Sequence, residues 1–124
     1  MILTELNQKG NFKSWPESRL KEIKNGRFSE AVGEVLFENS VIKLWEILLK
    51  PSERIPFRIH NNNYSCTSFS DGLLVSRNVN GEIVLLRIKK GGTFFWENKA
   101  NENIHDLENV GETSVRITII EEKL

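Results

Sequence analysis

The sequence is poor in cysteine and has no excess of either charge. Cys66 is the only cysteine among 124 residues, so no disulfide can form within the chain, and this usage is typical of a reducing compartment. Lysine and arginine number 17, as do aspartate and glutamate, so the chain lacks the basic field that attracts nucleic acids and anionic membranes. We therefore predict no nucleic-acid partner and no membrane partner.

The sequence also lacks a long hydrophobic run and a targeting segment. The N-terminal residues 1–6 contain no positively charged stretch followed by an apolar one, and no window reaches the length of a membrane span. With the single cysteine, these absences predict a cytoplasmic protein. No repeat, low-complexity stretch or linker divides the chain, and an apolar content of 39% suits one globular domain.

One short helix is predicted near the N-terminus, after about 13 residues that we interpret as a strand or an arm. The segment 14–17, Ser-Trp-Pro-Glu, has the spacing of a capping box with Pro16 in the first helical turn. Leu20 and Ile23 fall on one face, and the pair Asn25-Gly26 ends the helix. Because two to three turns are unstable alone, we expect this helix to dock on another part of the protein.

From Val35 onward the chain has the pattern of short strands separated by turn residues. The expected strands span residues 35–37, 41–49, 64–69, 73–79, 83–88, 93–96 and 115–120. Asn80-Gly81 lies between two of them and predicts a type I′ hairpin turn. Several short strands without helices between them favour an all-β barrel or sandwich.

The strand expected at residues 41–49 is apolar on both faces. One face can line a core, but the other needs a cover from the N-terminal segment or from a second subunit. This pattern predicts a homodimer, with two-fold symmetry as the expected arrangement.

Two motifs in the chain resemble those of the cupin superfamily. The first family motif is a glycine, a His-x-His pair, a glutamate and a glycine. Here Ser52 takes the place of the first glycine, Arg58 and His60 take the histidine places, Ser65 takes the glutamate place, and Gly72 matches. In the second motif Gly92, His105 and Asn109 match, whereas the family's Pro-x-Gly turn would fall on Ala100 and Glu102.

A narrower similarity, to small cupins that include β-alanine degradation proteins, rests on Trp45-Glu46, Pro51, Tyr64, His105-Asp106 and 109–111. The resemblance implies an all-β cupin fold, a double-stranded β-helix or jelly-roll barrel with a short N-terminal helix. It divides the chain into an N-terminal arm and helix, residues 1–34, packing on the barrel or on a dimer partner, and a cupin barrel, residues 35–124. Small cupins also tend to form dimers.

In many cupins four residues of these motifs bind one divalent metal. Their places here hold Arg58, His60, Ser65 and His105, so only two good ligands remain, and the guanidinium would repel a cation. We therefore predict no cofactor and no tightly held metal. If a metal is bound, the resemblance implies His60 and His105 as its ligands. The carboxylates that could replace the missing one are Glu97, Glu102 and Asp106.

The altered motif also suggests a binding site. Residues two apart on a strand share a face, so Arg58 and His60 are expected to point into the barrel together. A guanidinium in a semi-enclosed pocket suits a carboxylate or a phosphate, which predicts a small anionic ligand. His60 and His105 would hydrogen-bond it or act as acid and base, and Tyr64 would donate from the rim.

Simpler interpretations of the same residues stay open. Arg58 can face outward or pair with Glu53 or Glu46, and the histidines and Tyr64 can be ordinary wall residues. Asp106 and Asn109 are expected to be turn residues. The aromatic residues expected to pack the barrel are Phe57, Phe69, Phe94, Phe95 and Trp96.

Three functions follow from these alternatives. The first is a metal-independent cupin that binds a small molecule through Arg58, His60, Tyr64 and His105, with isomerase-like acid–base chemistry as an extension. The second is a metal-dependent dioxygenase or lyase that uses His60 and His105. The third is a non-catalytic dimeric structural or regulatory cupin with its cavity closed by Phe and Trp side chains. We favour the first, because an idle core would be expected to discard these polar groups.

Overall fold

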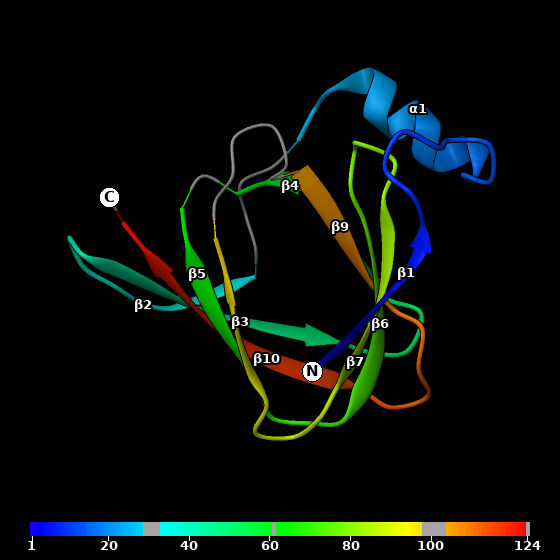
Figure 1. Ribbon diagram of the computed structural model, residues 1–124. Helices are drawn as coiled ribbons and strands as arrows, with labels where there is room; N and C mark the ends of the chain where they lie inside the picture. The colour runs from blue at the N-terminus through cyan, green and yellow to red at the C-terminus, as the bar shows by residue number, and fades with distance from the viewer. Residues whose placement is uncertain (29–32, 61, 98–103, 124) are drawn as a thin grey trace.

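The computed structural model describes residues 1–28, 33–60, 62–97 and 104–123. Within these residues ten strands form two antiparallel sheets that face each other around a common interior (Figure 1). The first sheet has the order β1 (Ile2–Asn7), β7 (Ile83–Ile88), β6 (Gly72–Arg77), β9 (Ile104–Asn109) and β4 (Arg54–Ile59). The second has the order β2 (Glu34–Glu38), β3 (Ile42–Leu49), β10 (Val115–Glu122), β5 (Tyr64–Ser68) and β8 (Thr93–Trp96).

This arrangement confirms the predicted all-β, jelly-roll architecture with one short helix among the described residues. Three strands were not predicted from periodicity, β1, β4 and β9; of these, β4 bears Arg58 and β9 bears His105, and these two strands pair with each other. β1, which comes from the predicted N-terminal arm, is hydrogen-bonded to β7 and forms an edge of the first sheet.

The core lies between the sheets and follows the alternation of each strand. On β3 the inward residues Trp45, Ile47 and Leu49 are buried, while Leu48 on the opposite face is exposed. The inward residues of β10 alternate in the same way, and Val115 is fully buried. The strand predicted to be apolar on both faces therefore has one face in the core and one face partly open.

The hairpin between β6 and β7 is confirmed, but the predicted turn type is wrong. Only Gly81 of the pair has a positive φ, 103°, whereas a type I′ turn needs one at Asn80 as well. The Gly81 amide donates to the Asn78 carbonyl at 2.9 Å, and the Asn78 amide donates to the Glu82 carbonyl at 2.8 Å. This pattern is that of a type I turn followed by a glycine bulge, in which only the glycine needs positive φ.

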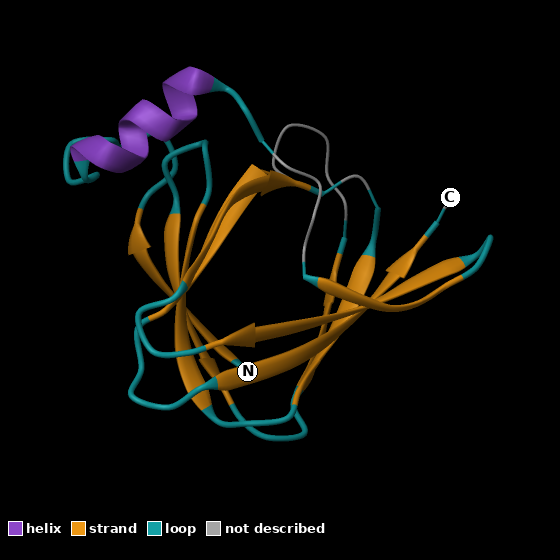
Figure 2. Ribbon diagram, turned by 180° about the vertical axis from the view of Figure 1, so that it is seen from behind, coloured by secondary structure: helices purple, strands orange, loops and turns teal. Residues whose placement is uncertain are grey.

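The helix α1 (Glu17–Asn25) is present and ends at Gly26, which adopts the left-handed conformation as predicted. The prediction of a capping box is wrong. Pro16 is the N-cap residue and no side chain caps the helix, because the Ser14 hydroxyl donates to Asn7 Oδ1 instead. Figure 2 shows α1 outside the two sheets, at one end of the barrel. No helix among the described residues is long and apolar enough to span a membrane.

The docking of α1 depends on its flanking residues more than on the helix itself. None of the helical residues is buried. Trp15, just before the helix, is buried and stacks on Phe57 of β4 with ring centroids 6.2 Å apart, and its indole nitrogen donates to the Gly81 carbonyl. The helix thus docks on the barrel, as expected, through the contact of Trp15 with Phe57 and through an ion pair between Glu22 of α1 and Arg54 of β4.

Candidate functional site

A β-bulge in β4 determines which of its side chains face the interior. Ile55 pairs with Leu107, but the next paired residue, Arg58, pairs with His105, so three steps on β4 match two steps on β9. The extra residue reverses the alternation, which places Arg58 on the same face as Ile55 and turns Phe57 outward against Trp15. Arg58 therefore points into the barrel, and the outward alternative is excluded.

The structure brings together all four predicted ligand-binding residues. Arg58, His60 and His105 are 2%, 4% and 6% exposed, respectively. The rings of His60 and His105 stack with centroids 4.5 Å apart, and the Tyr64 ring lies 4.9 Å from that of His60. They come from β4, the residue just after it, β5 and β9, so the group joins the two sheets at one end of the interior.

Hydrogen-bond partners define the tautomers of the two histidines. The Nδ1 atom of His105 lies 3.3 Å from the backbone carbonyl of Asp106, which can only accept, so Nδ1 carries the proton. Its Nε2 is therefore an acceptor and faces the Tyr64 hydroxyl at 3.4 Å. In His60, Nε2 accepts from Arg58 Nε at 3.2 Å, which leaves the proton on Nδ1. Both imidazoles are held in their neutral forms.

Burial shifts the pKa values of these groups away from their charged forms. Burial, together with His105 and Arg58, lowers the pKa of His60 from 6.5 to about 2. Burial, together with Arg58, lowers the pKa of His105 to about 3. Burial raises the pKa of the Tyr64 phenol, and it raises that of the Cys66 thiol to about 12. At neutral pH all four groups are uncharged.

Arg58 is the exception, because it is a buried cation without a carboxylate partner in the part of the chain that the structure describes. Burial lowers the pKa of its guanidinium, yet an arginine stays protonated at neutral pH. Among the described residues its Nη1 atom has no hydrogen-bond partner. Leaving a buried charged donor unpaired costs free energy, so the site favours an anion or another acceptor beside this atom.

A small cavity of about 30 Å³ adjoins this group. Arg58, Tyr64, Ser76 and His105 line its polar side, and the rest of its wall is mostly apolar. Ser76 was not predicted. Its hydroxyl donates to the Asp106 carbonyl at 2.8 Å and lies 3.3 Å from His105 Nδ1. The available signal was its spacing of two from the core residue Leu74, which places both on one face.

The assignment of Ser65 to the glutamate place of the first motif is wrong in space. On β5 Tyr64 and Cys66 are buried and line the cavity, whereas Ser65 lies on the opposite face. Because neighbouring residues of a strand alternate, a shift of one position exchanges inside for outside. Tyr64 therefore occupies the inward position.

The assignment of Ser52 to the first glycine place agrees with the backbone. Ser52 has φ 72° and is the only non-glycine residue with positive φ among the described residues. Glycine adopts this conformation without strain, which explains why the family pattern has a glycine there.

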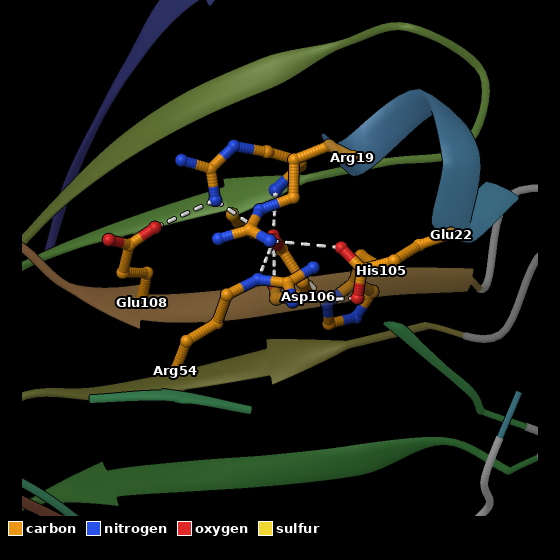
Figure 3. Close-up of polar contacts among 8 residues, drawn as sticks. Arg19, Glu22, Arg54, His105, Asp106 and Glu108 are labelled. Carbon is orange, nitrogen blue, oxygen red and sulfur yellow. Dashed lines mark hydrogen bonds and ion pairs between the residues drawn. The ribbon is translucent and has the colours of Figure 1, made fainter. Parts of the chain in front are cut away.

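Asp106 was predicted to be a turn residue, and this prediction is wrong. It lies within β9 and is the centre of an ion-pair network on the outer face of that strand. It is fully buried, and its Oδ2 accepts from Arg54 Nε at 2.8 Å and from Arg77 Nη1 at 2.9 Å. Arg54 also binds Glu22 of α1 at 2.9 Å, and Arg77 Nη1 lies 2.9 Å from Glu108. Figure 3 shows Arg54, Glu22 and Glu108 converging beside Asp106. This network ties the helix to the wall behind His105.

Asn109 was also predicted as a turn residue. It ends β9 and is fully buried, and its side chain stabilises the turn that follows, donating to the carbonyls of Leu49 and Thr113 and accepting from the Gly111 amide. The prediction is thus right about its side chain, which hydrogen-bonds nearby backbone groups, and wrong about its position, because Asn109 is the last residue of β9.

The predicted aromatic packing is correct for some residues only. Phe94 and Trp96 pack on the core from β8. Phe69 and Phe95 are exposed, and Phe57 packs outside the barrel.

The donor set does not fit a divalent metal. The rings of His60 and His105 are nearly parallel, 12° apart, so their in-plane lone pairs do not converge at metal–nitrogen distance, and each Nε2 already faces a protein donor. No group of three or more His, Cys, Asp or Glu suited to a metal exists among the described residues. Of the candidate carboxylates, Glu97 is exposed and Asp106 faces the other side, while Glu102, like Ala100, lies outside the described residues. Metal independence stays a prediction.

Comparison with known proteins supports the fold. No family model matches the chain, and no curated protein matches it. Among solved structures, a cupin domain from Bordetella pertussis Tohama I is similar with a TM-score of 0.66 and 18% identity, covering 79% of this chain and 98% of that one. An RmlC-like cupin family protein with a double-stranded β-helix fold from Methanocaldococcus jannaschii has a TM-score of 0.57 and 16% identity, over 77% of this chain and 84% of that one.

A third neighbour is a sugar phosphate isomerase of the cupin superfamily from Silicibacter pomeroyi DSS-3. Its TM-score is 0.50 and its identity 15%, over 68% of this chain and 52% of that one. Identities at this level report on the fold alone. The two facing antiparallel sheets and these neighbours together show that the chain has the RmlC-like jelly-roll fold of the cupin superfamily.

Proposed function

We propose that this protein binds a small anion, a carboxylate or a phosphate, inside the barrel without a tightly held metal. The observation that carries the proposal is Arg58, a buried guanidinium whose Nη1 has no partner among the described residues and which lines a cavity. An anion there would supply the missing countercharge and accept a charge-assisted hydrogen bond. One structural neighbour is named a sugar phosphate isomerase, so sugar phosphates are one class to test.

The two histidines support binding more than acid–base catalysis. A catalytic base or acid works best with a pKa near the working pH. Because burial lowers the pKa of His60 to about 2 and that of His105 to about 3, neither imidazole exchanges a proton readily at neutral pH. Their role in this proposal is to hold Arg58 and Tyr64 in place.

The test is anion binding by the wild type and by Arg58→Met, which keeps an extended side chain without charge. Thermal unfolding is recorded against sodium acetate and sodium phosphate at constant ionic strength. We expect at least one of the two anions to stabilise the wild type saturably and neither to stabilise Arg58→Met. Arg116→Met, on the outer surface of β10, is the matched control and should behave as the wild type. If neither anion stabilises the wild type more than Arg58→Met, the proposal fails.

A second candidate is a dimeric structural module. The cavity of about 30 Å³ is small, and Phe94 and Trp96 contribute to its wall, as that function predicts. A row of outward positions also crosses the second sheet. The strand registers place Phe37 beside Leu44, Leu44 beside Ile120, Ile120 beside Ser65, and Ser65 beside Phe95.

This row is exposed at three of its positions: Phe37 is 51%, Ile120 43% and Phe95 59% exposed. Contiguous apolar surface of this kind marks an interaction site more often than isolated residues do. It supports the predicted homodimer, with the outer faces of two copies of the second sheet packed together.

Sedimentation at micromolar concentration tests this candidate. Phe95→Thr with Ile120→Thr retains β-forming residues and should convert a dimer to a monomer. Leu3→Thr, an exposed apolar residue on the edge strand β1 of the other sheet, is the control and should leave the mass unchanged. A wild type that sediments as a monomer excludes the candidate.

A further inference from the structure

The polar end of the cavity carries a single positive charge. Arg58 supplies it, and Tyr64, Cys66, His60 and His105 are neutral because burial disfavours their charged forms. No aspartate or glutamate lines the cavity among the described residues. A ligand with one negative charge therefore balances the site. A phosphate monoester carries about −1.5 to −2 at neutral pH and would leave excess negative charge buried.

Beyond this end the cavity offers almost no partners for polar groups. Its wall is formed mainly by aliphatic and aromatic side chains, among them Leu74, Leu86, Ile88, Phe94 and Ile117. The hydroxyl proton of Ser76 is already donated to a backbone carbonyl. A sugar hydroxyl placed against this wall would give up its bonds to water without replacement, which costs about tenfold in affinity for each group. The ligand body that fits is apolar.

The cavity volume limits the size of that body. About 30 Å³ holds roughly two water molecules, so without movement of the wall it accepts little more than a carboxylate group. Each methylene that enters gains about fourfold in affinity from burial. A longer chain has to displace close-packed core side chains, which reverses the gain.

We infer that the ligand is a short monocarboxylate of about one or two carbons, bound with its carboxylate at Arg58 Nη1 and its carbon end against Leu74 and Ile88. This inference rests on the proposed function and narrows it to one ligand class. The carboxylate accepts from Nη1, which has no hydrogen-bond partner among the described residues, and the carbon end meets apolar wall.

Isothermal titration of the wild type with a chain-length series tests the inference. The probes are the sodium salts of formate, acetate, propionate, butyrate and hexanoate, with propionamide as the neutral match of propionate, and inorganic phosphate and glucose 6-phosphate as the dianions. We expect affinity to rise about fourfold from formate to acetate and to fall from propionate to hexanoate. Propionamide and both phosphates should show no saturable binding.

Three variants sharpen the result. Arg58→Met should abolish binding of every carboxylate, and Arg116→Met should leave the series unchanged. Ile88→Val removes one methyl group from the wall and should move the optimum toward a longer chain, with little effect on folding. The wild-type series decides the question even if a variant fails to fold.

The outcomes separate the two proposals. If phosphate or glucose 6-phosphate binds in an Arg58-dependent way and the carboxylates do not, the inference is overturned and the proposed function stands. If no anion binds, both fail. Equal carboxylate binding by Arg58→Met would mean general salt effects and would overturn the inference as well.

Discussion

Strand β4 carries two arginines four residues apart that lie in opposite environments. Arg54, on the outer face, binds Asp106 at 2.8 Å and Glu22 at 2.9 Å. Arg58, on the inner face, has no ion pair with a carboxylate among the described residues and donates to neutral His60. The same side chain is structural where carboxylates surround it and available for a ligand where they do not.

The pKa values of the two arginines express this difference. Burial alone would lower the pKa of Arg54, but hydrogen bonds to Glu22 and Asp106 outweigh burial and raise it. For Arg58 burial dominates, and the pKa is lowered. One charge stabilises the fold and the other costs free energy, which is the pattern expected of a site under functional constraint.

The largest effect is expected at Asp106, the centre of the outer network. Asp106→Asn leaves Arg54 and Arg77 largely buried without their shared countercharge and should lower the free energy of unfolding by about 3 to 5 kcal/mol. Urea unfolding followed by circular dichroism measures this loss. The control Glu108→Gln, at the partly exposed margin of the network, should cost about 1 kcal/mol. A similarly small loss for Asp106→Asn would contradict the central role of this carboxylate.

The second largest effect is expected from acid, which should lower the free energy of unfolding through His60 and His105. The folded pKa values of His60 and His105, about 2 and about 3, lie below their ordinary value of 6.5, so between these limits the unfolded chain binds protons that the folded chain does not. The stabilisation is complete above pH 6.5 and is lost as the pH falls, by about 1.4 kcal/mol per pH unit for each histidine. Urea unfolding at pH 7 and pH 5.5 measures the slope. His105→Gln should reduce it by about half, and an equal slope in that variant would show that other groups cause it.

The paired variants Arg54→Met and Arg58→Met should change stability in opposite directions. Removing Arg54 leaves Asp106 and Glu22 short of a partner and should cost about 2 kcal/mol. Removing Arg58 eliminates a buried cation that no described carboxylate pairs with, and should gain about 1 kcal/mol in the absence of ligand. Thermal and urea unfolding of the two proteins side by side give the comparison. A loss of stability in both would mean that Arg58 is as structural as Arg54.

The smallest effect is expected at Tyr64. Its hydroxyl lies 3.4 Å from His105 Nε2, a long hydrogen bond, so Tyr64→Phe should lower the free energy of unfolding by less than about 1 kcal/mol. Urea unfolding measures it, with affinity for acetate recorded on the same sample. A loss comparable to that of Arg54→Met would show that this contact holds the two sheets together.

Prediction succeeded where local pattern carries the information. Alternating apolar residues identified seven of the strands, and Gly81 and Gly26 marked turns that need positive φ. Motif spacing placed Arg58, His60 and His105 in one group, which the structure confirms as a spatial cluster.

Prediction failed where a position depends on partners distant in sequence. Asp106 reads locally as a turn former, but its role follows from Arg54 and Arg77 on neighbouring strands. The inward position of the first motif was assigned to Ser65, whereas Tyr64 occupies it in the structure. This is an error of one residue, and in a strand a shift of one residue moves a side chain to the opposite face. Ser14 could not be excluded as a cap because its partner, Asn7, belongs to another segment.

The sequence by itself determined that this chain forms short antiparallel strands without disulfides and that one basic and two imidazole side chains stand at motif positions. Only the tertiary structure decided that Arg58 faces inward, since the bulge that reverses β4 exists only in the pairing with β9. It also decided that Arg54 is neutralised and Arg58 is not. Among residues 1–28, 33–60, 62–97 and 104–123, carboxylates reach one face of the strand and not the other, and that distribution arises from packing rather than from any local run of residues.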